Sequence, residues 1–121
     1  MFGVVPSSLR YIKNGQMRAL AVSTEQRLDV LPDVPPMADY LPGYEASGWY
    51  GIVAPKDTPV DVVERLNRTM NAGVADPTLK QRLAELGCLV YPGTPAAMAT
   101  FVAREIDKWA KVIRTAGIKA E

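Results

Sequence analysis

The stretch GWYGIVAPKDTPVDVVERLN, residues 48–67, decides the character of the fold. It opens with a short apolar run typical of a buried strand and continues through a proline-containing loop. Thr58 as a cap and Pro59 at the first helical position predict that an amphipathic helix follows. Asp57 and Asp61 already supply the negative charge that a helix N-terminus favours, so an external anion would be repelled there. The stretch holds no histidine and no cysteine, and we interpret this βα unit as scaffold.

Composition excludes several classes of protein. The 121 residues are enough for one domain, and 48% of them are apolar, so the chain can fill a core. The net charge of +1 comes from scattered basic residues, which does not favour nucleic acid. No apolar run is long enough to span a membrane, and no signal peptide opens the chain. One cysteine excludes an internal disulfide, and the lack of histidine removes the commonest general base and metal ligand.

Segments of strand and helix character alternate along the chain. Short apolar runs predict strands at Met1–Val5, Arg18–Ser23, Trp49–Ala54 and Cys88–Tyr91. Helices are expected to begin at Pro6, Pro59, Pro77 and Pro95, and to end before Gly15, beyond Val74, before Gly87 and before Gly117. The proline-rich stretch 24–48 reads as loop, one helical turn and loop. This order predicts an α/β fold with a mostly parallel sheet. The sheet would have so few strands that other strands are missing or come from a partner chain.

Ser7 and Ser8 are the polar pair with the clearest binding potential. They follow a predicted strand end and open a helix, which is where ligands bind in open α/β sheets. A helix N-terminus offers free N–H groups and a positive dipole end, and no acid lies in the first turn, while Arg10 and Lys13 follow. The site therefore suits a carboxylate. The structural alternative is that Ser7 simply caps the helix.

Other polar and aromatic candidates favour structural roles. Glu105 falls on the apolar stripe of the last helix and needs a partner, although a raised pKa would suit it for acid–base chemistry. Cys88 lacks a histidine base and is expected in the core. Trp49 and Tyr50 either stack on a ligand or pack in the core. Arg104, Lys108 and Lys111 are expected to solvate the opposite face of the last helix. No constellation supports covalent, metal or acid–base catalysis.

An ordered series of motifs resembles one known family. The motifs are Gly15–Val22, Arg27, Leu31–Pro35, Pro42–Glu45, Trp49–Gly51, Ala54–Pro55, Thr58–Pro59, Leu66–Asn67, Gly87, Thr94–Pro95, Glu105, Trp109 and Ala116–Ile118. In this order and spacing they resemble the C-terminal part of the tripartite tricarboxylate transporter substrate-binding proteins, the Bug or TctC family. The resemblance covers essentially the whole chain.

The resemblance implies a receptor. Family members are extracytoplasmic, usually periplasmic, with two α/β lobes of type II periplasmic-binding-protein architecture and a ligand cleft between them. They capture small carboxylates, namely di- and tricarboxylates, acidic amino acids or aromatic acids, and deliver them to membrane subunits of a transporter. The resemblance implies no cofactor, no metal and no reaction on the ligand.

The resemblance also places this chain within such a receptor, as parts of both lobes. Residues 1–48 would be the remainder of the second lobe and the crossing between lobes, and residues 49–121 the C-terminal part of the first lobe. The segment bordering the cleft matches the physical candidate above, which gives Phe2, Gly3, Ser7 and Ser8 as ligand-binding residues. Gly3 stands where the family often has aspartate, so one polar contact is expected to be lost.

The length of the chain opens an alternative. Family members are typically more than twice as long, so this chain alone is expected to bind ligand weakly or not at all. The resemblance implies the periplasm, whereas the chain as written, without a signal peptide, would stay in the cytoplasm. The alternative function is that of a truncated, non-binding remnant that self-associates through exposed sheet edges as a homo-oligomer.

Overall fold

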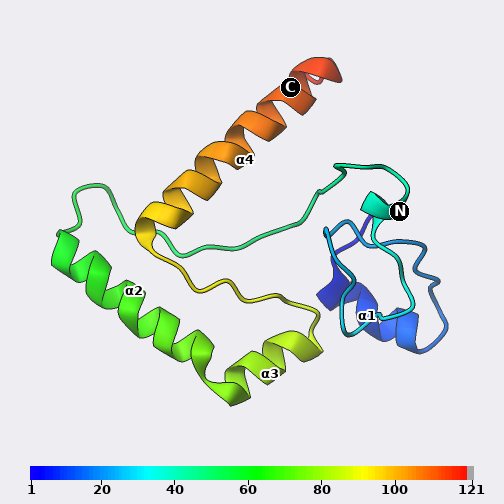
Figure 1. The fold of residues 1–121 in the computed structure, drawn as a ribbon, viewed down its shortest axis with the longest axis horizontal. Helices are drawn as coiled ribbons and strands as arrows, with labels where there is room; N and C mark the ends of the chain where they lie inside the picture. Colours follow the sequence, from blue (N-terminus) through cyan, green and yellow to red (C-terminus); the bar gives the residue numbers. More distant parts are fainter. Residues whose placement is uncertain (120–121) are drawn as a thin grey trace. The chain divides into compact units, whose positions relative to one another are not determined.

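The computed structural model describes residues 1–119, which form two compact units. The first unit comprises residues 1–53 and 74–91, and the second comprises residues 54–73 and those from 92 onward. Four α-helices and one 3-10 turn occur in the described chain (Figure 1). In order, they are α1 (Val5–Lys13), η1 (Met37–Asp39), α2 (Val60–Ala75), α3 (Pro77–Glu85) and α4 (Pro95–Thr115).

Helices α3 and α4 begin and end where the sequence predicts. The Asp76 carboxylate and the Thr94 hydroxyl each accept a hydrogen bond from the N–H three residues later, at 3.0 and 3.1 Å. A proline follows each cap, and both helices end before a glycine in the left-handed region, Gly87 at φ +75° and Gly117 at φ +65°. These caps satisfy backbone groups that the helix ends leave unpaired. The predictions for both helices are confirmed.

Helices α1 and α2 begin differently from the expectation. α1 starts at Val5, and Ser7 lies inside its first turn, where its Oγ donates to the Val4 carbonyl at 3.0 Å. Ser7 is therefore not the cap. α2 starts at Val60, one residue later than expected, and the Thr58 hydroxyl donates back to the Pro55 carbonyl at 2.8 Å. In both cases the hydroxyl bonds to the backbone of the loop that leads into the helix, which is the local competition typical of serine and threonine.

The four predicted strands do not form in the described chain. A parallel bridge between Val22 and Pro36 is the β pairing found among residues 1–119, and Figure 1 draws the predicted strands as plain tube. The prediction is wrong for these residues taken by themselves. The physical reason is that a strand is defined by hydrogen bonds to a neighbouring strand, and an apolar pattern supplies the side chains but not the neighbour.

The proline-rich stretch, residues 24–48, supplies part of the core of the first unit. Leu28 is 3% exposed and Leu31 is 7% exposed, and both belong to this stretch. They cluster with Leu9 of α1 and with Val22. The prediction of loop, helical turn and loop is confirmed by η1. The sequence did not indicate that half of the buried apolar cluster comes from this loop.

Backbone bonds and one ion pair hold the proline-rich stretch in place. The Val22 N–H donates to the Pro35 carbonyl at 2.9 Å, and the Met37 N–H donates to the Val22 carbonyl at 2.8 Å. The Arg27 guanidinium lies 3.5 Å from the Asp39 carboxylate. Both charged side chains are half exposed, so the ion pair contributes little and the backbone bonds fix the path.

Gly87, which follows α3, packs against the start of α1. A Cβ at this position would lie 2.6 Å from Val5 Cγ1, which is closer than real side chains approach, and 3.1 Å from Val30 Cγ2, which is a tight contact. The positive φ of Gly87 adds a second reason for glycine. The backbone of Gly87 therefore packs directly on two valines of the first unit.

Replacing Gly87 with alanine tests this close approach. We expect Gly87→Ala to lose about 1 kcal/mol of unfolding free energy from its φ and about 1–3 kcal/mol more from overlap with Val5. Gly15→Ala is the matched control, because Gly15 has φ +70° after α1 with no atom within 4 Å of its Cβ position. The measurement is urea unfolding of both variants. Equal losses would contradict the packing of Gly87 on Val5.

The second unit contains an asparagine clamp between α2 and the start of α4. The Asn71 side chain donates to the Gly93 carbonyl at 2.9 Å and accepts from the Gly93 N–H at 3.2 Å. Asn67 donates to the same carbonyl at 2.8 Å. Because Thr94 follows directly, the clamp positions the N-terminal cap of α4.

Removing Asn71 should loosen this connection. Asn71→Ala loses both bonds to Gly93 and should cost about 1 kcal/mol, and the Gly93 amide should exchange with solvent at least about tenfold faster. Asn67→Ala loses one bond to a carbonyl that keeps its other donor, so its cost should be smaller. Hydrogen exchange at Gly93 measures both effects. An unchanged Gly93 amide in Asn71→Ala would contradict the clamp.

Candidate ligand site

The four predicted ligand-binding residues lie at the N-terminal end of α1. Phe2 is 87% exposed, and Gly3 and Ser7 are also exposed, whereas Ser8 is half-buried. Gly3 and Ser8 are brought together, because a Cβ on Gly3 would lie 2.9 Å from Ser8 Oγ. The backbone at Gly3 thus runs past the Ser8 hydroxyl.

The electrostatics of this end suit an anion. The first intrahelical bond runs from the Ser8 N–H to the Val4 carbonyl at 3.2 Å. The N–H groups of Val5 and Ser7 precede it at the positive end of the helix dipole. The first turn has no acidic residue, and the basic residues Arg10 and Lys13 lie in the last turn. The geometry offers N–H and hydroxyl donors but no carboxylate that would compete with a bound one.

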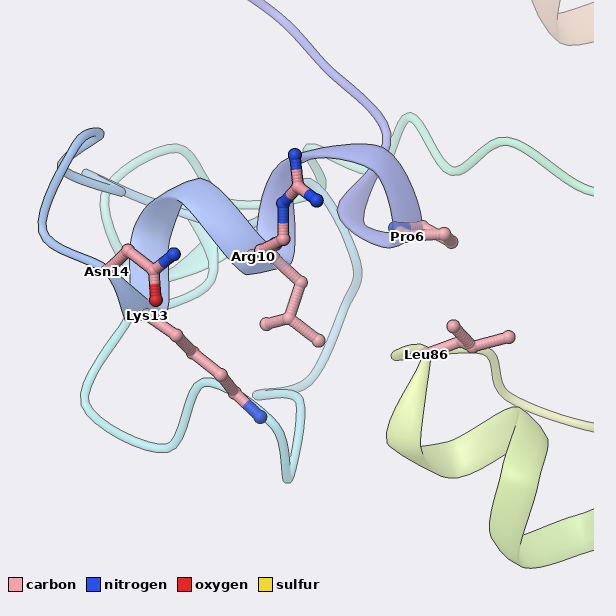
Figure 2. Close-up of a pocket in the computed structure, with 6 residues that line it drawn as sticks. Pro6, Arg10, Lys13, Asn14 and Leu86 are labelled. Atoms are coloured by element: carbon pink, nitrogen blue, oxygen red, sulfur yellow. The ribbon is translucent and has the colours of Figure 1, made fainter.

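A shallow hollow of about 320 Å³ lies along the flank of α1. Figure 2 shows α1 on one side and Leu86, from the end of α3, on the other, with Pro6 above Leu86. Its lining is Pro6, Leu9, Arg10, Lys13, Asn14 and Leu86, which combines an apolar floor with two cations. None of the four predicted ligand-binding residues lines it. The sequence did not indicate this hollow, because Leu86 reaches α1 only through the packing of Gly87.

The aromatic and thiol candidates are less buried than a core position requires. Trp49 is 42% exposed and Tyr50 is 97% exposed, so of the two alternatives core packing does not occur in the structure of the described residues, and stacking on a ligand stays a prediction. Cys88 is half-buried and lines a second hollow, of about 310 Å³, together with Asp29 and Lys80. The physical reason is the same for all three, because each lies in a predicted strand that does not pair.

Glu105 is buried and paired, as the sequence requires. It is 6% exposed, and the Trp109 Nε1–H donates to its Oε2 at 3.1 Å. The Lys108 ammonium lies 3.0 Å from Oε1. Lys108 is therefore not only a solvating residue on the opposite face, which corrects the sequence interpretation. Lys108 lies three residues after Glu105, and side chains at this spacing are neighbours on one face of a helix.

Substitution of Glu105 should show how much this pairing contributes to the free energy of unfolding. Glu105→Ala leaves the Trp109 indole and the Lys108 ammonium without this acceptor, and should cost about 2 kcal/mol. Glu105→Gln keeps an oxygen for the indole and should cost less. Glu64→Ala is the control, because its pair with Arg68 at 3.7 Å is exposed and worth under about 0.5 kcal/mol. Urea unfolding followed by tryptophan fluorescence measures the series. A loss in Glu105→Ala no larger than the control would contradict the assignment.

Two further features bear on the class of site. The described residues contain no group of three or more side chains of the types that ligate metal ions. Among the helices of residues 1–119, none is long and apolar enough to cross a membrane.

Comparison with solved structures defines the class of protein. The backbone matches that of Rpa4515 from R. palustris, solved with adipate, at a TM-score of 0.83 and 36% identity, over 93% of this chain and 38% of the other. It matches the periplasmic binding protein BugD at a TM-score of 0.84 and 33% identity, over 94% of this chain and 39% of the other. The fold is therefore that of a periplasmic binding protein, present in part, and the predicted class of partial α/β fold is confirmed.

Sequence comparison gives the family. Residues 1–118 match the model of the tripartite tricarboxylate transporter family receptors, and the chain belongs to that family. It is 34% identical over 116 residues to protein BugT of Bordetella pertussis, covering 95% of this chain and 36% of BugT. It is 39% identical over 110 residues to a protein encoded in the TAR-I ttuE-ttuC' intergenic region of Agrobacterium vitis, covering 88% of this chain and 32% of that protein. The chain thus spans about a third of the length of these relatives. The family consists of receptors and is not a family of enzymes.

Proposed function

We propose that this chain is the C-terminal part of a solute receptor that captures small carboxylates for a tripartite tricarboxylate transporter. The observation that carries the proposal is the family match over residues 1–118, joined to the similarity with a receptor solved with adipate, a dicarboxylate. On this proposal the receptor works in the periplasm, delivers its ligand to the membrane subunits of the transporter and performs no reaction on it.

The proposed ligand site is the N-terminal end of α1. A carboxylate oxygen placed there would accept hydrogen bonds from the Val5 and Ser7 N–H groups and from the Ser8 hydroxyl. The Ser7 hydroxyl is already engaged with the Val4 carbonyl, so Ser8 is the side-chain donor that we assign to the ligand. Phe2 and Gly3 would border the ligand, and glycine leaves room beside the Ser8 hydroxyl that a larger residue would fill.

The proposed division into lobes follows the family resemblance. Residues 1–48 belong to the second lobe and the crossing between lobes, and residues 49–121 to the first lobe. The ligand cleft would then use residues from a part of the receptor that this chain does not span. For this reason we expect the chain alone to show no carboxylate-dependent change in melting temperature.

A chimeric receptor tests the proposal. In it, residues 1–118 replace the matched part of the adipate-bound relative. We expect adipate or a related di- or tricarboxylate to raise its melting temperature, and Ser8→Ala to weaken binding about tenfold through loss of a charge-assisted hydrogen bond. Ser7→Ala is the matched control and should have a smaller effect. A chimera that unfolds cooperatively but responds to none of the di- and tricarboxylates, acidic amino acids or aromatic acids would overturn the proposal.

A second candidate function is self-association of the chain. One observation favours it, namely that every residue from 49 to 54 is exposed although this run has the pattern of a buried strand. Such an edge pairs readily with another chain. Light scattering of the chain by itself distinguishes the two functions, because self-association predicts a mass that rises with concentration.

A further inference from the structure

The hollow along the flank of α1 has the size and the lining of a small-molecule site. Its volume is about 320 Å³, and it is bordered by α1, by Asn14 at the end of that helix and by Leu86 at the end of α3. Pockets that hold small organic ligands have volumes of about 300–1,000 Å³ and are mostly apolar, with a few polar groups that fix the orientation of the ligand. The hollow meets both criteria at the small end of the range.

Three apolar side chains, Pro6, Leu9 and Leu86, form the floor. Leu9 is 7% exposed and belongs to the core, whereas Leu86 is 48% exposed. Figure 2 shows Leu86 opposite α1 and below Pro6. Leu86 therefore keeps apolar surface that the body of a ligand would remove from water.

Two cations, Arg10 and Lys13, lie at the rim of this floor. In the part of the chain that the structure describes, neither forms an ion pair with a carboxylate. Figure 2 shows their side chains pointing in opposite directions from α1. The Arg10 guanidinium lies 5.2 Å from the centroid of the Tyr11 ring and is held there by a cation–π contact. Lys13 is therefore the cation better placed to bind an anion.

Asn14 adds a neutral donor to the rim. It caps the C-terminal end of α1, where its backbone N–H donates to the Arg10 carbonyl at 3.1 Å. Its side chain is exposed and lines the hollow. An ammonium group and an amide NH2 group are both donors, and a carboxylate accepts hydrogen bonds with both of its oxygens. The polar part of the rim thus suits a carboxylate.

A structural alternative explains the cations alone. Arg10 and Lys13 lie in the last turn of α1, where positive side chains interact favourably with the negative end of the helix dipole. That interaction requires no apolar neighbour. Here the cations border a floor completed by Leu86 from a different helix, and the combination of charge with an apolar floor favours a ligand.

We propose that this hollow binds a small organic monocarboxylate. The apolar body of the ligand rests against Pro6 and Leu86, and its carboxylate accepts hydrogen bonds from Lys13 and Asn14. The ligand carries one carboxylate rather than two, because Arg10 is already engaged with the Tyr11 ring.

This site is separate from the proposed ligand site at the N-terminal end of α1. None of the four predicted ligand-binding residues lines the hollow, and its whole lining belongs to the first unit. The inference is therefore independent of the proposed function, and either of the two can fail alone.

Titration of the 121-residue chain with hexanoate, followed by heteronuclear NMR, tests the proposal. We expect the amide resonances of Asn14 and Leu86 to shift to saturation with a Kd on the order of 1 mM, as for other ligands with few atoms. At ligand concentrations near this Kd the melting temperature hardly moves, so the amide shifts are the readout. Acetate lacks the apolar body and hexanol lacks the charge, so each should bind at least about tenfold more weakly.

Three results of this titration would overturn the proposal. The first is the absence of saturable shifts at Asn14 and Leu86. The second is equally tight binding of acetate or hexanol. The third is a set of shifts confined to residues 3–8, because the carboxylate would then lie at the N-terminal end of α1.

Two pairs of variants locate the site. Lys13→Gln removes the charge and should weaken hexanoate binding about tenfold, whereas Lys111→Gln changes an exposed lysine of α4 and should have no effect. Leu86→Ala shortens the apolar floor and should weaken binding about fivefold, whereas Leu79→Ala changes a 40% exposed leucine of α3 outside the hollow and should have no effect. Equal effects within either pair would overturn the proposal.

The chimeric receptor extends the test to the assembled protein. Hexanoate should shift Asn14 and Leu86 there as well, and Lys13→Gln should leave the response to adipate unchanged. Loss of these shifts in the chimera would mean that another part of the receptor covers the hollow, which overturns the inference. A chimera that binds hexanoate at the hollow but responds to no carboxylate through Ser8 would contradict the proposed function and leave this inference standing.

Discussion

Backbone hydrogen bonding between strands is the constraint on which the rest of this structure depends. A helix satisfies its backbone within one segment, so α1 to α4 all form, and α3 and α4 have side-chain caps and stop residues in place. A strand needs a neighbour, and the described chain pairs one residue, Val22, with Pro36. The segments of strand character consequently remain unpaired, and the aromatic and thiol side chains that they carry are exposed or half-buried.

Where the chain does pack, loops and close backbone approaches hold it together. In the first unit, Leu28 and Leu31 from the proline-rich stretch complete the apolar cluster around α1, and Gly87 fixes the end of α3 against Val5 and Val30. In the second unit, the side-chain amides of Asn67 and Asn71 bind the backbone of Gly93 and so place the cap of α4. These contacts join residues distant in sequence within each unit.

The distribution of charge at α1 connects this architecture to function. The helix dipole is positive at its N-terminal end, and no acid in the first turn offsets it. The last turn carries two bases. On the proposed function, N–H groups and a hydroxyl at this end of α1 would hold a carboxylate reversibly, so that the receptor could release it unchanged.

Local interactions explain what the sequence by itself determined. Caps such as Asp76 and Thr94 and stop residues such as Gly117 act within a few residues, so the bounds of α3 and α4 were predictable, and the ordered motifs identified the family. The need of Glu105 for partners followed from its place on the apolar stripe, and Lys108 meets it because the two residues have the i,i+3 spacing of neighbours on a helix. Phe2, Gly3, Ser7 and Ser8 lie at the N-terminal end of α1, and their role in ligand binding stays a prediction, whereas the bond of Ser7 to Val4 depends on a hydroxyl orientation that the sequence does not specify. Only the tertiary structure decided that Val22 pairs with Pro36 while the predicted strands do not form in the described chain, that the proline-rich loop supplies half of the buried apolar cluster, and that Leu86 meets α1. These features depend on contacts between residues distant in sequence, and such contacts exist only when both partners are present.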